Sequence, residues 1–258
     1  MKKTILASLL LFSVLAAFSF QSCNKAPKKT ELTVLAAASL TDVCAELKTA
    51  YEKEHPGTEI FFSFGGSGAL KAQIESGVPA DLFISAAQKQ MQELDDKNLM
   101  EKQSIKNLLK NEVVLIAPKE SKLKINSFEE LPQAGMIAVG EPESVPIGMY
   151  TKQICTYLGI WSAVEKKANF ASDVRTVLSW VESGECDFGV VYKTDAAASG
   201  KIQVIAAAPK NSCPQVIYPV GVIGSSQNKA GAAAFEDFLF SGNAESIFTK
   251  HGFSVVKD

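Results

Sequence analysis

Two serines stand at points where an apolar strand is expected to end and a helix to begin. Ser39 follows the apolar run 32–37, and Ser67 lies in the GGSG segment that follows the run 58–64. The start of a helix offers free N–H groups and the positive end of the helix dipole, and both favour an anion. The glycines around Ser67 would let the backbone approach such a ligand closely. The two positions therefore predict an anion site, although Gly and Ser are also frequent in ordinary turns.

Ser39 also has a purely structural interpretation. Asp42 follows it by three residues, which is the spacing of a capping box, in which the serine oxygen accepts a hydrogen bond from an N–H group of the first helical turn. We therefore expect Ser39 to cap its helix in addition to any contact with a ligand.

Three further hydrogen-bond donors are expected later in the chain. Ile147 and Val174 stand at predicted helix starts and would offer backbone N–H groups, and Tyr192 ends the apolar strand FGVVY and would offer its hydroxyl. Ligands of open α/β sheets collect beyond the carboxyl ends of the strands, so helix starts from two lobes could converge on one small anion. Arg175, the only arginine in the chain, lies beside Val174, where we expect it to form an ion pair near the helix start.

The elements that must position these residues alternate between strands and helices after residue 31. This order predicts an α/β fold with largely parallel sheets flanked by helices. Two apolar segments, 113–118 and 216–223, are typical of strands that are buried on both sides or that cross between lobes. We therefore expect one lobe from residues 31–113 and 221–258 and a second from residues 114–220.

The first 22 residues predict an export signal. Lys2 and Lys3 precede the apolar run 5–20, which is shorter than the ~20 residues that span a bilayer. Cys23 follows a small residue at the end of this run, as in a lipoprotein signal, although Phe20 replaces the usual leucine. We expect an exported protein whose Cys23 carries a lipid and whose residues 23–30 form a linker, the alternative being ordinary signal cleavage.

Composition argues against nucleic acid as a partner. The chain has 258 residues, of which 47% are hydrophobic, and 26 basic residues against 28 acidic ones. This balance is typical of a folded globular protein and provides no basic surface for nucleic acid. Four cysteines remain besides Cys23, namely Cys44, Cys155, Cys186 and Cys213. They match no metal-binding motif and allow three disulfide connectivities, among which the sequence does not choose, so buried free thiols are the simpler expectation.

Six segments, in order, resemble the periplasmic molybdate-binding proteins of ABC transporters. They are distributed through essentially all of the exported part: VLAAASLTDV (34–43), FGGSGAL (64–70), SGVPADLFISA (76–86), AVGEPESVPIGMY (138–150), ASDVRTVLSWVESGECDFGVVYKTDA (171–196) and YPVGVI (218–223). The resemblance implies a two-lobed periplasmic-binding-protein fold with a two-stranded hinge, closing on molybdate or tungstate. It further implies a monomer that delivers its ligand to an ABC permease and uses neither a cofactor nor a directly coordinated metal.

The resemblance also implies which residues hold the oxyanion. They are two serine hydroxyls, two backbone N–H groups and one tyrosine hydroxyl, which correspond here to Ser39, Ser67, Ile147, Val174 and Tyr192. The same five positions follow from the predicted helix starts and strand ends. The second loop departs from the family because it reads GGSG where serines are common, and Ile147 replaces a smaller residue.

Two alternatives remain open at this point. The same fold could bind sulfate or another small oxyanion in place of molybdate. A secreted serine hydrolase using Ser67 is a poorer match, because Ala69 replaces the last glycine of the G-x-S-x-G motif and no general base is apparent.

The predicted anchor can be tested directly. Replacing Cys23 with serine should abolish fatty-acid labelling and release the protein from the membrane, because the lipid would be attached through the Cys23 thiol. Metabolic labelling with a fatty acid, followed by cell fractionation, measures both effects. An unlabelled parent protein would refute lipidation.

Overall fold

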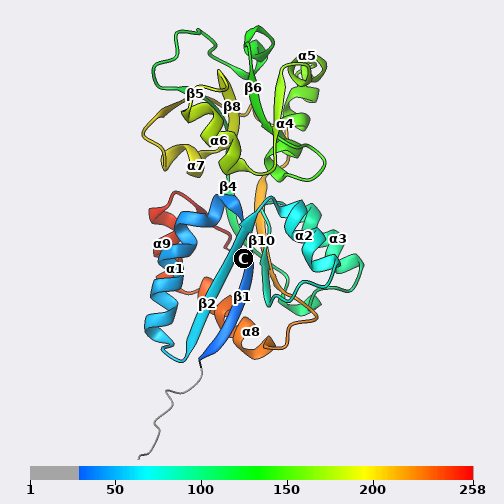
Figure 1. The fold of residues 1–258 in the computed structure, drawn as a ribbon, viewed down its shortest axis with the longest axis vertical. Helices are drawn as coiled ribbons and strands as arrows, with labels where there is room; N and C mark the ends of the chain where they lie inside the picture. Colours follow the sequence, from blue (N-terminus) through cyan, green and yellow to red (C-terminus); the bar gives the residue numbers. More distant parts are fainter. Residues whose placement is uncertain (1–28, 258) are drawn as a thin grey trace, which may run out of the picture.

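The computed structural model describes residues 29–257, so the expected signal 1–22 and Cys23 lie outside the described part. Two lobes are stacked along the long axis of the molecule (Figure 1). Each lobe contains one sheet with helices packed against it.

Lobe one contains a six-stranded sheet in the order β11-β4-β10-β3-β1-β2. Its elements are β1 (Thr30–Ala37), a 3₁₀ turn (Ala38–Leu40), α1 (Thr41–Glu54), β2 (Thr58–Gly65), α2 (Ser67–Glu75), β3 (Leu82–Ile84), α3 (Gln88–Asp96), a second 3₁₀ turn (Lys102–Ser104), β4 (Lys106–Asn111), β10 (Val216–Val222), α8 (Lys229–Leu239), α9 (Gly242–Lys250) and β11 (Ser254–Val255).

Lobe two contains a five-stranded sheet in the order β7-β6-β8-β5-β9. Its elements are β5 (Val113–Pro118), a 3₁₀ segment (Phe128–Gln133), β6 (Ile137–Gly140), α4 (Pro146–Tyr157), α5 (Trp161–Glu165), β7 (Ala168–Ala171), α6 (Val174–Glu182), β8 (Phe188–Tyr192), α7 (Lys193–Ala197) and β9 (Ile202–Ala207).

The expected α/β fold is confirmed, with sheets that are mixed. In lobe one, β2, β1 and β3 are parallel, whereas β10 and β4 pair antiparallel. In lobe two, β7, β6 and β8 are parallel, whereas β5 and β9 pair antiparallel. The reason is geometric. The parallel strands of each lobe run toward the cleft between the two lobes. A strand that enters a lobe from this cleft, such as β5 or β10, runs away from the cleft and therefore pairs antiparallel.

The chain passes between the lobes at two places. Glu112 alone separates β4 of lobe one from β5 of lobe two, and the chain returns between β9 and β10. β10 pairs with lobe one from its first residue, since Val216 lies opposite Asn111. We therefore place the return before Val216, whereas the sequence led us to expect residues up to 220 in lobe two.

The helices form where apolar residues recur at helical spacing. In α1 the buried residues are Val43, Cys44, Leu47 and Tyr51, and in α6 they are Val174, Val177, Leu178 and Val181. The α6 set has the three- and four-residue spacing of one helical face, and the helix ends shortly before Gly184, whose φ of +77° is favoured only by glycine.

Alternation along the strands of lobe one divides its core into two layers. Leu35 and Phe83 pack with Leu70, Ile74 and other residues of the α2–α3 layer. Residues one position away along the same strands belong to the larger core, which also contains α1, α8 and α9.

All four cysteines of the described chain are free thiols, and Cys44, Cys155 and Cys186 are buried. Within residues 29–257, no helix is long and apolar enough to cross a membrane.

Candidate functional site

The five predicted ligand-binding residues line one small cavity between the lobes. Ser39, Ser67, Ile147, Val174 and Tyr192 all contribute to its wall, and none is more than 4% exposed. The cavity volume is about 10 Å³, which is close to the least that holds one water molecule. The space therefore suits only a small, compact ligand, which the lobes must part to admit.

Each lobe brings its donors to the cavity in the same way. Ser39 lies in the 3₁₀ turn after β1, and Ser67 is the first residue of α2, which follows β2. In lobe two, Ile147 and Val174 open α4 and α6, which follow β6 and β7, and Tyr192 is the last residue of β8. The carboxyl ends of parallel strands from both sheets thus meet at one point.

The two backbone donors are free because of the local sequence at each helix start. In α4 the first position is Pro146, which has no N–H group, so Ile147 supplies the first one. In α6 the preceding Asp173 accepts a hydrogen bond from the backbone N–H of Thr176 at 2.9 Å and so caps the helix from its side. The N–H of Val174, in the first turn, has no acceptor within the helix.

The hydroxyl of Ser67 is oriented by a neighbouring backbone group. Its Oγ accepts a hydrogen bond from the N–H of Ala86 at 3.0 Å. With one lone pair occupied in this way, the hydroxyl hydrogen remains available for an acceptor in the cavity.

The hydroxyl of Ser39 is oriented by a chain of buried side chains. The backbone N–H of Glu112 donates to Oδ1 of Asn111 at 2.9 Å, which fixes the Asn111 amide so that its NH₂ points the other way. This NH₂ group donates to Oγ1 of Thr194 at 2.9 Å and to the hydroxyl oxygen of Tyr218 at 3.3 Å.

These hydrogen bonds allow Ser39 to be a donor toward the cavity. The Tyr218 hydroxyl, which already accepts from Asn111, lies 2.9 Å from Oγ of Ser39 and can donate to it. The hydrogen of Ser39 is then free for a ligand. Burial raises the pKa of Tyr218 well above its usual value, so its hydroxyl keeps its proton at neutral pH.

The expected capping box is wrong. Neither the 3₁₀ turn nor α1 has a side-chain cap, because Ser39 bonds Tyr218 and Asp42 pairs with Arg175. Thr41 closes the turn in their place, donating from Oγ1 to the carbonyl of Ala38 at 2.7 Å. A loss of stability in Ser39→Ala would therefore come from the buried Tyr218 contact.

Tyr192 presents a buried hydroxyl without a partner. Its side chain is 1% exposed, and within residues 29–257 its hydroxyl oxygen has no hydrogen-bond partner. An unsatisfied buried hydroxyl is costly, so a ligand acceptor at this point would relieve the cost. Burial also raises the pKa of Tyr192 well above its usual value, which keeps the hydroxyl a donor.

The cavity wall provides donors and small apolar groups. Besides the five donors it consists of alanine, glycine, valine and proline: Ala37, Ala38, Gly65, Gly66, Ala86, Val145 and Pro146. Among the described residues that line it, there is no acidic, lysine, arginine or histidine side chain. Residues 29–257 also hold no group of three or more His, Cys, Asp and Glu residues that could bind a metal ion. The arrangement can therefore bind an acceptor-rich ligand by neutral hydrogen bonds.

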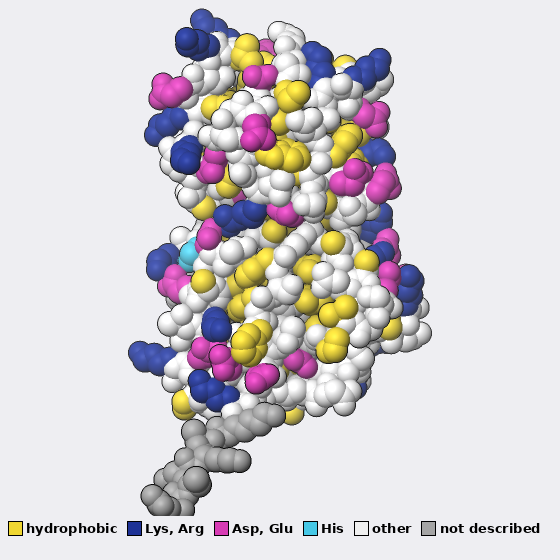
Figure 2. Space-filling model, viewed as in Figure 1, with side chains coloured by type: hydrophobic (Ala, Val, Ile, Leu, Met, Phe, Trp, Pro, Cys, Tyr) yellow, Lys and Arg dark blue, Asp and Glu magenta, His cyan; other side chains and the backbone are white. Residues whose placement is uncertain are grey.

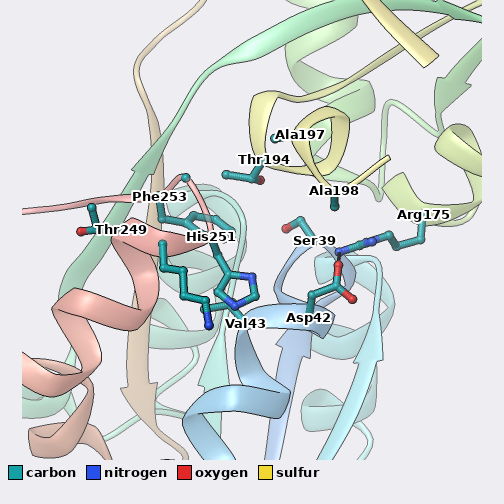
Figure 3. A pocket seen from close by; sticks show the side chains of 12 residues that line it. Ser39, Asp42, Val43, Arg175, Thr194, Ala197, Ala198, Thr249, His251 and Phe253 are labelled. Atoms are coloured by element: carbon teal, nitrogen blue, oxygen red, sulfur yellow. Dashed lines mark hydrogen bonds and ion pairs between the residues drawn. The ribbon is translucent and has the colours of Figure 1, made fainter. Parts of the chain in front are cut away.

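A larger groove of about 250 Å³ lies beside the cavity (Figure 3). Ser39 lines both spaces, and Asp42, Arg175 and Thr194 line the groove alone. Arg175 points toward Asp42 and forms the expected ion pair near a helix start, at 2.6 Å between Nη2 and Oδ2. The arginine does not line the cavity.

Sequence reasoning missed two residues that orient the donors. Tyr218 lies in β10 and Asn111 ends β4, so both belong to the strands that connect the lobes. Tyr218 was part of a matching segment, but nothing in its spacing relates it to Ser39, which is 179 residues away. Only the pairing of β10 with β3 and β4 brings it beside Ser39.

Comparison with known proteins places the chain among solute receptors. Residues 32–254 match the family of bacterial extracellular solute-binding proteins. The chain is 40% identical to a putative ABC transporter substrate-binding lipoprotein, YvgL, of Bacillus subtilis, over 97% of this chain and 96% of that protein. It is also 40% identical to the molybdate-binding protein ModA of Escherichia coli, over 93% and 95% of the two chains.

A solved structure agrees. The substrate-binding domain of a putative molybdenum ABC transporter from Clostridium difficile superposes with a TM-score of 0.68 at 39% identity, covering 89% of this chain and all of that one.

The buried hydrogen bonds that link Asn111, Tyr218 and Ser39 predict a measurable effect on stability. Tyr218→Phe removes the hydroxyl between Asn111 and Ser39 and leaves a buried amide hydrogen without its acceptor, so the free energy of unfolding should fall by about 1–3 kcal/mol. Urea denaturation measures it, with Tyr157→Phe at a 63% exposed position as the control. Equal stability of the two variants would contradict this account.

Proposed function

The chain belongs to the bacterial extracellular solute-binding proteins, and we propose that it captures molybdate outside the cytoplasm and delivers it to an ABC permease. The names of the relatives support both parts, since the E. coli protein is named for molybdate binding and the B. subtilis protein for an ABC transporter. Tungstate, which has the same charge and shape, is proposed as a second ligand.

The lining of hydroxyls and helix-start N–H groups, without a charged side chain among the described residues, is the observation that carries this proposal. Molybdate at neutral pH is a fully deprotonated dianion, so each of its oxygens can only accept hydrogen bonds. Three hydroxyls and two backbone N–H groups face the space in which it would lie, and hydrogen bonds to a charged acceptor are the stronger kind. Helix starts from both lobes add favourable dipoles, so a counter-charge inside the cavity is unnecessary.

We assign one donor to each predicted position. Ser39, Ser67 and Tyr192 would donate from hydroxyls, and Ile147 and Val174 from backbone N–H groups. What supports the assignment is that the Ser67 hydroxyl accepts from the Ala86 N–H, that the Ser39 hydroxyl can accept from Tyr218, and that the Tyr192 hydroxyl is buried without a partner among the described residues. No cofactor is needed for such binding.

The same geometry argues for a receptor over a serine hydrolase. A nucleophilic Ser67 would need a general base within hydrogen-bond reach, and its Oγ instead accepts from the N–H of Ala86. The two histidines are engaged elsewhere, His55 stacked on Tyr51 and His251 bonded to Glu46.

Anchoring through Cys23 completes the proposed arrangement. The B. subtilis relative is named a lipoprotein, which agrees with the lipoprotein-like sequence before Cys23 here. A lipid on Cys23 would keep the receptor, as a monomer, near its permease.

Removing single donors tests the site. Ser39→Ala, Ser67→Ala and Tyr192→Phe each delete one hydrogen bond to a charged ligand, worth about 1.5–3 kcal/mol, so the dissociation constant for molybdate should rise roughly ten- to a hundredfold. Isothermal titration calorimetry measures it, and Ser246→Ala on an exposed part of α9 is the control. Parent-like affinity in all three site variants would show that molybdate binds elsewhere.

The absence of a carboxylate acceptor among the described residues of the cavity wall predicts selectivity. Phosphate near neutral pH keeps a proton, which would be buried without a partner at a cost of about 1–3 kcal/mol or more, so phosphate should not bind detectably. Sulfate is an unprotonated dianion with shorter bonds, and donors fixed on two lobes cannot all contract onto it. Competition titrations should give molybdate and tungstate similar affinities and sulfate a much weaker one. Tight binding of sulfate or phosphate would instead assign the cavity to that ion.

A further inference from the structure

Arg175 joins the two lobes beside the cavity. It belongs to α6 in lobe two, yet its Nη2 lies 2.6 Å from Oδ2 of Asp42 in α1 of lobe one. Its Nε also donates to the carbonyl of Ala38 in lobe one at 3.3 Å. Figure 2 shows basic and acidic side chains side by side on the surface where the lobes meet.

We infer that Arg175 and Asp42 form an interlobe clasp that holds the lobes closed and sets how long a bound ligand stays. The inference rests on the proposed function, because the ligand in question is the oxyanion. In this role Arg175 and Asp42 are positioning residues, since neither lines the cavity.

The place of the clasp in the chain supports this role. Arg175 directly follows Val174, whose N–H is a proposed ligand donor, and Ala38 directly precedes Ser39, whose hydroxyl is another. The contact between Arg175 and the Ala38 carbonyl therefore fixes the separation of two donors that belong to different lobes. If the lobes move apart at this point, both hydrogen bonds to the ligand lengthen together.

Arg175 is anchored on its own lobe by a second carboxylate. Asp195 of α7 is fully buried, and its Oδ1 lies 3.2 Å from Nε of Arg175. Burial raises the pKa of Asp195 to about 7, against the lowering effect of the Arg175 charge. The rigid, planar guanidinium can contact both carboxylates at once, so Arg175 can keep Asp195 as its partner when the lobes part.

The two carboxylates differ in how easily each can separate from Arg175. Asp195 is inaccessible to solvent, whereas the Asp42 side chain is 48% exposed and regains water when it separates. The pair across the lobes is therefore weak enough to break and reform, as exposed ion pairs generally are. Asp42 is also the better residue to replace, because its removal leaves Asp195 paired.

A second contact between the lobes lies at the start of α2. The N–H of Gly68 donates to the carbonyl of Ser144 in lobe two at 2.9 Å. A side chain at Gly68 would overlap the Ser144 backbone, and one at Gly66 would overlap the Ser172 carbonyl. At this point the two lobes are in contact through backbone atoms, because glycines leave no side chain between them. Near Ser39 the contact between the lobes is the clasp.

The clasp lies in the groove beside the cavity (Figure 3). Asp42 and Arg175 line this 250 Å³ groove, and Ser39 lines both the groove and the cavity. The pair is therefore separated from the cavity by Ser39.

Asp42→Asn tests the clasp with little change of shape. It removes the charge that Arg175 contacts across the lobes, so radiolabelled molybdate should leave about two- to fivefold faster when chased with unlabelled molybdate. The association rate, obtained from the dissociation rate and the dissociation constant, should not fall, because lobes that stand further apart do not hinder entry of the ligand. Asp42→Glu, which restores the charge, should recover most of the slow dissociation. Higher salt should speed dissociation from the parent but not from Asp42→Asn.

Glu143→Gln is the matched control. It breaks an exposed ion pair with Lys152 that lies within lobe two, so the dissociation rate should stay that of the parent. A dissociation rate for Asp42→Asn equal to that of Glu143→Gln would overturn the clasp.

Small-angle X-ray scattering of the ligand-free proteins separates this inference from the proposed function. At low salt the radius of gyration of Asp42→Asn should exceed that of the parent and of Glu143→Gln. If the parent binds no molybdate, the proposed function fails, and the clasp is then upheld by a larger radius of Asp42→Asn or overturned by an equal one.

Discussion

Both sheets direct the carboxyl ends of their parallel strands toward one cleft, and the remaining features of the molecule depend on this constraint. Because each lobe ends its parallel strands there, the helix starts that follow bring unpaired N–H groups to one point. The strands that enter each lobe from the cleft, β10 in lobe one and β5 in lobe two, must then run the opposite way, which makes each sheet mixed. The side chains on and beside these crossing strands, Asn111 and Tyr218 among them, are placed to orient the donors.

Charge is kept out of the cavity and placed at its edge. Burying an ion without a partner is costly, and a site built from neutral hydroxyls and N–H groups avoids that cost while the ligand is absent. Directionality is supplied by hydrogen bonds that begin at backbone groups, namely Glu112 N–H for the Ser39 side and Ala86 N–H for Ser67. Backbone groups cannot rotate or flip as side chains can, so the polarity of each hydroxyl is inherited from the fold itself. The charged residues Arg175 and Asp42 lie outside the cavity, where water can solvate Asp42 as the lobes open.

Closure therefore combines contacts of different kinds. At the start of α2, glycines allow backbone to meet backbone, and any side chain there would keep the lobes apart. Near Ser39, an ion pair spans the gap and can be broken at modest cost. A receptor must hold its ligand and also give it up, and a closure made of a close-fitting surface and a separable ion pair suits both requirements.

The sequence by itself determined the α/β class, the apolar periodicity of helices such as α6, and a set of donors that the structure gathers around one cavity. These features depend on local patterns, since helix starts, glycines and apolar periodicity act over a few residues. The tertiary structure alone decided which partners the donors and their neighbours contact. Ser39 has the spacing of a helix cap, yet its hydroxyl bonds Tyr218. The reason is that β10 pairs with β3, which itself pairs with β1, and this places the Tyr218 hydroxyl 2.9 Å from Oγ of Ser39. Likewise the sequence indicates an ion pair for Arg175 but not its partner, and the return of the chain to lobe one before Val216 follows from pairing with β4. Contacts between residues more than a hundred positions apart depend on how the sheets are ordered, which no local spacing encodes.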